Sequence, residues 1–303
     1  MDKNNFKKKF ADFHDKHYKL LLLIPIVLLI GCFIYMGYFY HQNGDFIHKD
    51  ISLTGGTSAT INSESLNPSD LKNAVSSKLK DVNIREISDL VSQKQVAIIV
   101  ETTSDENTTK TVLEDYLGYE LNGDNSSFEF TGSTLSENFY NQLLIAILIA
   151  FFLMAVVVFF QFKTPVPSLT VILCAFADIF MTLVTANLIG LTISSAGIVA
   201  FLMLIGYSVD TDILLTTRAI KREVGSLNRR MFESFKTGIT MTLTSVAAVL
   251  ASLIIVGSFS SVISQIFTIM TIGLLFDIFN TWLTNVCIIK WYVLKREKKK
   301  HEN

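Results

Sequence analysis

The stretch that decides the fold is IGYSVDTDILLTTR, residues Ile205–Arg218. It places two carboxylates, Asp210 and Asp212, inside a run that otherwise has the composition of a membrane span. A charged side chain at the centre of a spanning helix costs about 2.5–3.5 kcal/mol even on the lenient insertion scale. Two further apolar runs carry one carboxylate each, Asp178 and Asp277. A chain that keeps four such groups is expected to use them to move ions or protons, or to hold helices together.

The chain contains six apolar runs, and each is long enough to cross a hydrocarbon core about 30 Å thick. Half of its 303 residues are hydrophobic. The predicted transmembrane helices are 20–40 and, within 141–294, the segments 142–162, 166–190, 192–217, 238–257 and 263–289. The first run follows a polar tail and ends without a small-residue cleavage pattern, so we expect a permanent anchor and not a signal peptide. The pattern predicts an α-helical polytopic membrane protein.

Charge is distributed unevenly along the chain. Residues 41–140 hold sixteen Asp or Glu against seven Lys or Arg, whereas 1–19, 218–236 and 290–303 each hold six Lys or Arg. With six spans, both tails (1–19 and 295–303) and the 218–236 loop lie on one side, and the positive-inside rule makes that side the cytoplasm. We therefore expect a multi-pass protein of the cell membrane. Topology and contact with anionic headgroups of the lipid bilayer explain the basic runs, so no nucleic-acid partner is expected.

Residues 41–140 have the pattern of a compact extracytoplasmic α+β domain between the first and second spans. The predicted elements are strands at 51–61 (bent at Gly55-Gly56), 82–87, 96–100 and 127–131, with helices at 67–80 and 105–117. The order βαββαβ is that of the ferredoxin-like fold, which specifies no function by itself. Asn107 and Asn125 each begin a glycosylation acceptor tripeptide, a pattern that is also common by chance.

The fourth span has the densest polar pattern. Ser208, Asp212 and Thr216 recur at four-residue spacing and therefore share one helix face. Asp210 lies about 200° around the helix from Asp212, so the two carboxylates cannot face the same partner. One can serve a buried pathway while the other meets a neighbouring helix or subunit. The alternative for Asp210 is an ion pair close to Arg218 at the cytoplasmic end of the helix.

The last two spans also contain polar side chains. In the fifth, Thr240 and Thr244 stand on a stripe of small and hydroxyl-bearing residues, which can hydrogen-bond a carboxylate or simply permit tight helix packing. The candidates for a proton or ion relay are Asp178, Asp212, Asp210 and Asp277, supported by Ser208, Thr216, Thr240, Thr244 and Asn280. The sequence has no metal-ligand spacing, phosphate-binding loop or nucleophile constellation. We therefore expect no metal, no cofactor and no enzymatic activity.

Three motifs resemble the SecD/SecF family of protein-export membrane proteins, within the resistance–nodulation–division superfamily. Residues 50–57, which include Gly55, Gly56 and Thr57, are similar to the start of the family's first extracytoplasmic domain. Asp178 matches the Asp of the family's third span. The fourth-span signature is matched by Gly206, Tyr207, Ser208 and the closing Arg218, and the sequence around Asp277 is similar to the archaeal branch.

The resemblance implies an accessory subunit of the SecF type. It would pair with a SecD-like membrane protein at the Sec translocation channel and use the proton or ion gradient to draw unfolded secreted polypeptides outward. An ungapped match places the fourth-span Asp of bacterial relatives at Thr211, between the two carboxylates, so their proton-carrying role is not transferred to one residue here. Two alternatives stay open: a proton-coupled small-molecule exporter of the same superfamily, and a purely structural clamp on SecD.

Overall fold

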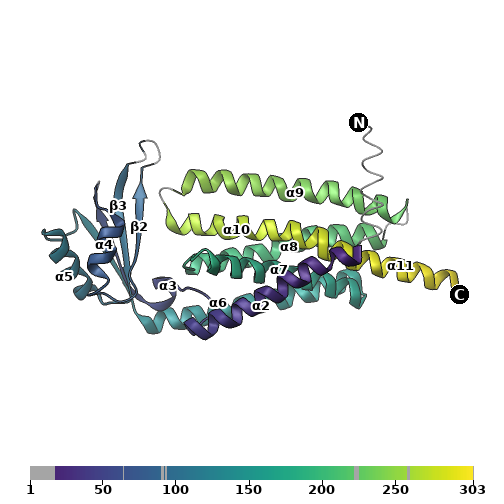
Figure 1. Cartoon of the computed structure of the whole chain (residues 1–303), viewed down its shortest axis with the longest axis horizontal. Coiled ribbons are helices and arrows are strands. Elements are labelled where there is room, and N and C mark those ends of the chain that lie inside the picture. Colours follow the sequence, from purple (N-terminus) through teal and green to yellow (C-terminus); the bar gives the residue numbers. More distant parts are fainter. Residues whose placement is uncertain are drawn as a thin grey trace.

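A computed structural model describes residues 18–302 except for 64, 90–91, 93, 222–224 and 258–259. It consists of a long helical bundle with a small αβ domain at one end (Figure 1). Six helices are long and apolar enough to cross a membrane, as predicted. Most of the predicted basic tail, 1–19, lies outside the described residues.

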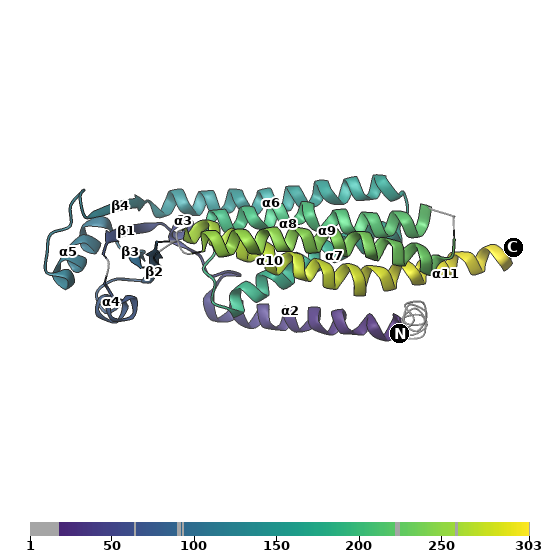
Figure 2. The ribbon, with the colours of Figure 1, turned by 90° about the horizontal axis from the view of Figure 1, so that it is seen from above.

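The bundle contains five uninterrupted long helices and one composite helix. They are α2 (Leu23–Asn43), α6 (Ser133–Phe162), α7 (Pro165–Leu188), α8 (Ser195–Lys221), α9 (Leu227–Val256) and a sixth made of α10 (Ser261–Asn280), the π-helical turn η1 (Thr281–Asn285) and α11 (Val286–Glu302). In α7 and α8, 56% of the apolar window is buried, against 17% for the first helix and 6% for α6. The centre of the bundle is therefore α7 and α8. Figure 2 shows α2 at its margin, where it packs on α7.

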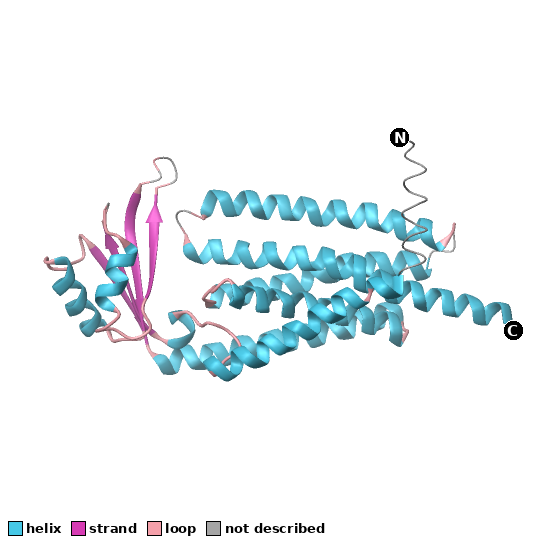
Figure 3. Cartoon of the chain, viewed as in Figure 1, coloured by secondary structure: helices cyan, strands magenta, loops and turns pink. Residues whose placement is uncertain are grey.

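The αβ domain contains β1 (Gly56–Asn62), α4 (Pro68–Val75), β2 (Asn83–Ser88), β3 (Gln95–Thr102), α5 (Glu106–Leu117) and β4 (Ser126–Thr131), in the predicted βαββαβ order. The sheet is antiparallel with strand order β2-β3-β1-β4. Both helices pack on one face of it, and the bundle lies beyond the other (Figure 3). Leu71 of α4 and Leu113 of α5 are fully buried against Ile61 and Ile98 of the sheet.

Two predicted elements of this region differ from the structure by more than two residues at one end. Residues 51–54, predicted as strand, form the short helix α3 (Ile51–Thr54), because Asp50 caps it by accepting a hydrogen bond from the Ser52 amide at 3.1 Å. The helix predicted to run to residue 80 ends at Val75. The Lys80 amide instead donates to the Ser104 hydroxyl, and the Lys80 carbonyl accepts from the hydroxyl of Thr102 at the end of β3, which draws the chain out of the helix.

The Gly55-Gly56 pair marks the junction between the bundle and the αβ domain. Gly55 has φ +80°, and an added Cβ would lie 2.5 Å from the Cα of Ser133 at the start of α6. Gly56 has φ +140°, and its Cβ would lie 2.2 Å from the Thr102 carbonyl oxygen. Only glycine fits both the backbone conformation and the available space. Thr57 follows and donates a hydrogen bond to the Ser104 carbonyl at 2.8 Å.

A second connection joins the αβ domain to the loop between α7 and α8. The Ile193 amide donates to the His48 carbonyl at 2.6 Å, and the Asp50 amide donates to the Ile193 carbonyl at 3.0 Å. Asp50 also accepts from Arg85 of β2 at 2.6 Å, and the same guanidinium pairs with Glu101 of β3. Burial, with the nearby Asp50 charge, raises the pKa of Glu101 above its ordinary value. The loop, α3 and the sheet are thus held by one network.

The junction gives a direct test of the fold. We expect Gly56→Ala to lower the free energy of unfolding by about 3 kcal/mol or more, because it adds a clash with Thr102 to an unfavourable φ. Thermal unfolding in detergent measures the loss. Gly37→Ala is the matched control, since nothing lies within 4 Å of that Cβ and α2 is helical there. Equal midpoints for the two variants would contradict the assigned role of Gly56.

Candidate functional site

Three carboxyl groups meet in the interior of the bundle. Asp178 of α7, Asp212 of α8 and Asp277 of α10 have exposed fractions of 0%, 0% and 1%. None of the three forms an ion pair within the described residues, where the Lys and Arg pairs all involve other acids. Because a buried charge without a counterion is costly, the hydrogen bonds to these groups decide which forms of them are stable. We call the three acids and their hydrogen-bond partners the carboxyl cluster.

Both oxygens of Asp178 accept a hydrogen bond. Its Oδ2 accepts from the Ser208 hydroxyl of α8 at 2.5 Å, and its Oδ1 accepts from the Asn280 amide of α10 at 2.7 Å. These two bonds join the third span to the fourth and to the sixth. They satisfy one lone pair on each oxygen of the carboxylate.

Asp212 is satisfied on one oxygen only. Its Oδ1 accepts from the Thr281 hydroxyl at 2.9 Å and from the Asn285 amide at 2.7 Å. Its Oδ2 is buried and has no hydrogen-bond partner among the residues that the structure describes. An orphaned buried oxygen of this kind is rare and is found where a proton or a water is accommodated.

The Thr281 hydroxyl lies between two acids. Its oxygen is 2.9 Å from Asp212 Oδ1 and 3.3 Å from Asp277 Oδ1, while Thr242 of α9 donates to the other Asp277 oxygen at 3.4 Å. A hydroxyl has a single proton and can donate to only one of the two acids. The second contact is a hydrogen bond only when that acid carries a proton and donates it to the Thr281 oxygen. The geometry therefore suits one proton shared by Asp212 and Asp277.

The π-helical turn η1 supplies much of the cluster. Besides Thr281, it contains Thr284, whose hydroxyl donates to Asn280 Oδ1 at 3.2 Å, and Asn285, whose Oδ1 accepts from Thr216 at 3.4 Å. Single π turns inside α-helices are rare and are often found at functional sites. In the sixth span, the break in helical periodicity coincides with the polar side chains that hold Asp178 and Asp212.

The structure brings together most of the predicted relay residues. Asp178, Asp212, Asp277, Ser208, Thr216 and Asn280 are all members of the carboxyl cluster. The placement predicted for Thr240 and Thr244 is wrong, because both are exposed and bond their own helix, to the carbonyls of Lys236 (2.8 Å) and Met241 (2.7 Å). Thr242, on the opposite face of α9, takes the place that we expected them to fill.

Asp210 lies outside the carboxyl cluster. It is exposed on α8 and, among the described residues, has no hydrogen bond or ion pair. The alternative of an anchoring pair near Arg218 is not formed, because that guanidinium donates to the Glu233 carbonyl and to the Thr237 hydroxyl, both at 3.0 Å. Gly206 and Tyr207 of the family motif are exposed as well.

Asn285 and Thr242 are members of the cluster that the sequence did not indicate. Asn280 and Asn285 are five residues apart, which would place them about 140° from one another on a regular α-helix. The π turn between them removes this separation, and helical periodicity gives no sign of such a turn. Thr242 lies between Thr240 and Thr244 in the sequence, and the four-residue spacing pointed to those two residues instead.

Comparison with known proteins gives a consistent family assignment. Residues 111–295 match the family model described as protein export membrane protein SecD/SecF, C-terminal. The protein-export membrane protein SecF of Methanocaldococcus jannaschii is 38% identical over 94% of this chain and 99% of its own length. That of Pyrococcus furiosus is 34% identical over 98% of each chain.

Solved structures agree on the fold. A crystal structure of SecDF, a translocon-associated membrane protein from Thermus thermophilus, matches with a TM-score of 0.69 at 20% identity over 95% of this chain. A second SecDF structure, in a super-membrane-facing form, matches with a TM-score of 0.60 at 16% identity. This chain spans 38% of the first SecDF chain and 40% of the second. Because the chain is similar to the archaeal proteins over nearly their full length, it belongs to the SecD/SecF family of protein-export membrane proteins.

Proposed function

We propose that this chain is an accessory subunit of the Sec protein-export machinery and that proton movement through the carboxyl cluster drives its work. The observation that carries the proposal is the burial of three acids without a cation, two of them bridged by one hydroxyl. In this arrangement the chain pairs with a SecD-like protein beside the Sec channel and acts on the unfolded secreted polypeptide. The αβ domain is ferredoxin-like and extracytoplasmic, and both termini are cytoplasmic.

The Thr281 bridge provides a balanced proton transfer. With Asp277 protonated, its O–H donates to the Thr281 oxygen, and the Thr281 hydroxyl donates to Asp212. When Asp212 takes the hydroxyl proton and Thr281 takes the proton of Asp277, one proton has moved from Asp277 to Asp212 and Thr281 is unchanged. An elementary charge that crosses 100 mV releases about 2.3 kcal/mol, which intramembrane carboxyls can couple to helix movement.

The alternatives fit less well. A structural clamp on SecD requires carboxyl groups whose hydrogen bonds are complete, whereas the buried Asp212 Oδ2 has no partner in the described part of the chain. A small-molecule exporter requires a substrate pocket, whereas the αβ domain fills its interior with its own apolar side chains, among them Leu71, Ile98 and Leu113. Membership in a protein-export family favours the polypeptide as substrate.

The proposed orientation can be tested by cysteine labelling. In a variant without Cys32, Cys174 and Cys287, we expect Asn107→Cys in α5 to react with a membrane-impermeant maleimide applied from outside. Lys236→Cys on α9 should react only after the membrane is permeabilised, and serves as the control for intact cells. Labelling of position 107 from the cytoplasmic side alone would invert the proposed topology.

The proton role predicts a specific loss of function. Asp178→Asn and Asp212→Asn keep the size of each side chain and remove its titration, so we expect assembly with the partner to persist and gradient-dependent secretion to fall at least about tenfold. Secretion of a reporter into inverted vesicles, with and without a proton gradient, measures this. Asp115→Asn on the exposed side of α5 is the matched control. Normal gradient-dependent export by the double variant would leave only the clamp.

The partner is proposed to dock on the face of α8 that carries Asp210. This face also presents Met203 and Tyr207, with exposed fractions of 46% and 47%, and Gly206, around whose Cβ position no atom lies within 4 Å. A carboxylate facing lipid is costly, whereas a glycine beside it lets another helix approach closely and offer a polar group. The exposed Thr240 and Thr244 belong to the neighbouring helix α9.

Substitutions on this face should weaken the complex. We expect Gly206→Leu to reduce co-purification with the SecD-like partner about tenfold or more, because it fills the space needed for close helix approach. Asp210→Leu should do the same while raising the thermal midpoint of the isolated subunit, since it removes a lipid-facing charge. Val157→Leu, at an exposed position of α6, is the control. Unchanged co-purification of both variants would exclude this face as the docking site.

A further inference from the structure

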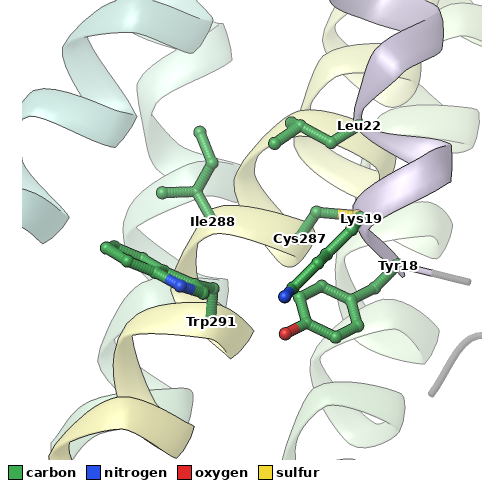
Figure 4. Close-up of a pocket in the computed structure, with 6 residues that line it drawn as sticks. All are labelled: Tyr18, Lys19, Leu22, Cys287, Ile288 and Trp291. Carbon is green, nitrogen blue, oxygen red and sulfur yellow. The ribbon is translucent and has the colours of Figure 1, made fainter. Parts of the chain in front are cut away.

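An apolar pocket lies where the first span begins, at the end of the bundle away from the αβ domain (Figures 1 and 4). Its volume is about 370 Å³, within the range of ligand sites. The residues that line it are Tyr18, Lys19 and Leu22 from the first span and Cys287, Ile288 and Trp291 from α11. The pocket separates the start of the first span from α11, whereas farther along α2 packs on α7.

The polar groups of the pocket gather at one end. Figure 4 shows the Lys19 ammonium close to the Tyr18 hydroxyl and facing Trp291, with Leu22 at the opposite end. Two further ammonium groups are nearby: that of Lys290 lies 5.7 Å from the centre of the Tyr18 ring, and that of Lys295 lies 5.0 Å from the centre of the Trp291 ring. Within the described residues, no carboxylate forms an ion pair with Lys19 or Lys295.

We propose that this pocket binds one anionic phospholipid, with its phosphate at Lys19 and Tyr18 and an acyl chain along Leu22 and Ile288. Tyr and Trp side chains mark the level of the lipid headgroups in membrane proteins, so the polar end of the pocket is at the height of the phosphate. Each lysine near such a surface attracts anionic lipid, and the exposed Lys19 and Lys295 both lie at this end of the pocket. The bound lipid contacts both α11 and the first span, which lies at the margin of the bundle. This role does not depend on the proposed proton path.

Charge complementarity distinguishes this occupant from two others. The segment 1–17 of the same chain holds five lysines and three aspartates, so its net charge repels a lysine-rich site. An apolar helix of another protein would fill the groove but would offer no negative charge to Lys19 and Lys295. An anionic phospholipid provides both the negative charge and the apolar acyl chain in one molecule.

Trp291 is a built-in reporter of the site. The chain has two tryptophans, so Trp282→Phe leaves Trp291 as the only one. In phosphatidylcholine vesicles that contain a small fraction of brominated phosphatidylglycerol, we expect at least threefold stronger quenching than with the same fraction of brominated phosphatidylcholine. Lys19→Gln should reduce this preference to near unity. Lys236→Gln, at an exposed lysine of α9 that does not line the pocket, should leave the preference unchanged.

Native mass spectrometry of the unsubstituted protein provides a second measurement that does not depend on how well Trp282→Phe folds. We expect one phosphatidylglycerol to be retained per chain, and to be lost in Lys19→Gln. Equal quenching by the two brominated lipids, or equal effects of Lys19→Gln and Lys236→Gln, would overturn the proposal. Removal of residues 1–17 that raises quenching by both lipids equally would show that the chain's own tail fills the pocket, and would overturn it as well.

Discussion

Burial of three acids without a cation is the constraint on which the rest of the bundle depends. In the hydrocarbon core no solvent is available, so the hydrogen-bond donors to these acids must come from the protein. Asp178 draws donors from α8 and α10, and Asp212 draws donors from the π turn η1. These bonds need α7, α8 and the sixth span side by side, which explains why α7 and α8 are the most enclosed helices.

Helical periodicity predicted much of this site because polar residues in an apolar span stand out clearly. The four-residue spacing of Ser208, Asp212 and Thr216 placed them on one face, and the structure buries all three. The same reasoning failed for α9, where hydroxyl groups occur on two faces. A threonine that donates to the carbonyl one turn back, as Thr240 does, needs no other partner and can face outward. The side of α9 that meets Asp277 is decided by packing, which the sequence does not display.

Local backbone features account for the other differences. The apolar run at Ile51–Thr54 has the composition of a strand, but the Asp50 cap and the positive φ of Gly55 make it a helical turn that ends before β1. The π turn in the sixth span is also set by its surroundings, because it lets Thr281 and Asn285 reach the same oxygen of Asp212. By contrast, the βαββαβ order depends on local signals, among them the caps at Asn67 and Asp105, whose side chains accept from the amides of Ser69 and Thr108.

The carboxyl cluster and the αβ domain are mechanically connected through the loop between α7 and α8. These helices carry Asp178 and Asp212, and the loop that joins them is bonded through Ile193 to the backbone of His48 and Asp50. Asp50 in turn holds Arg85 of the sheet. A displacement of α8 against α7 at this loop would therefore strain the hydrogen bonds of Ile193 to the αβ side of the junction. Gly55 and Gly56 add a second close contact there, because their backbones lie directly against Ser133 of α6 and Thr102 of β3.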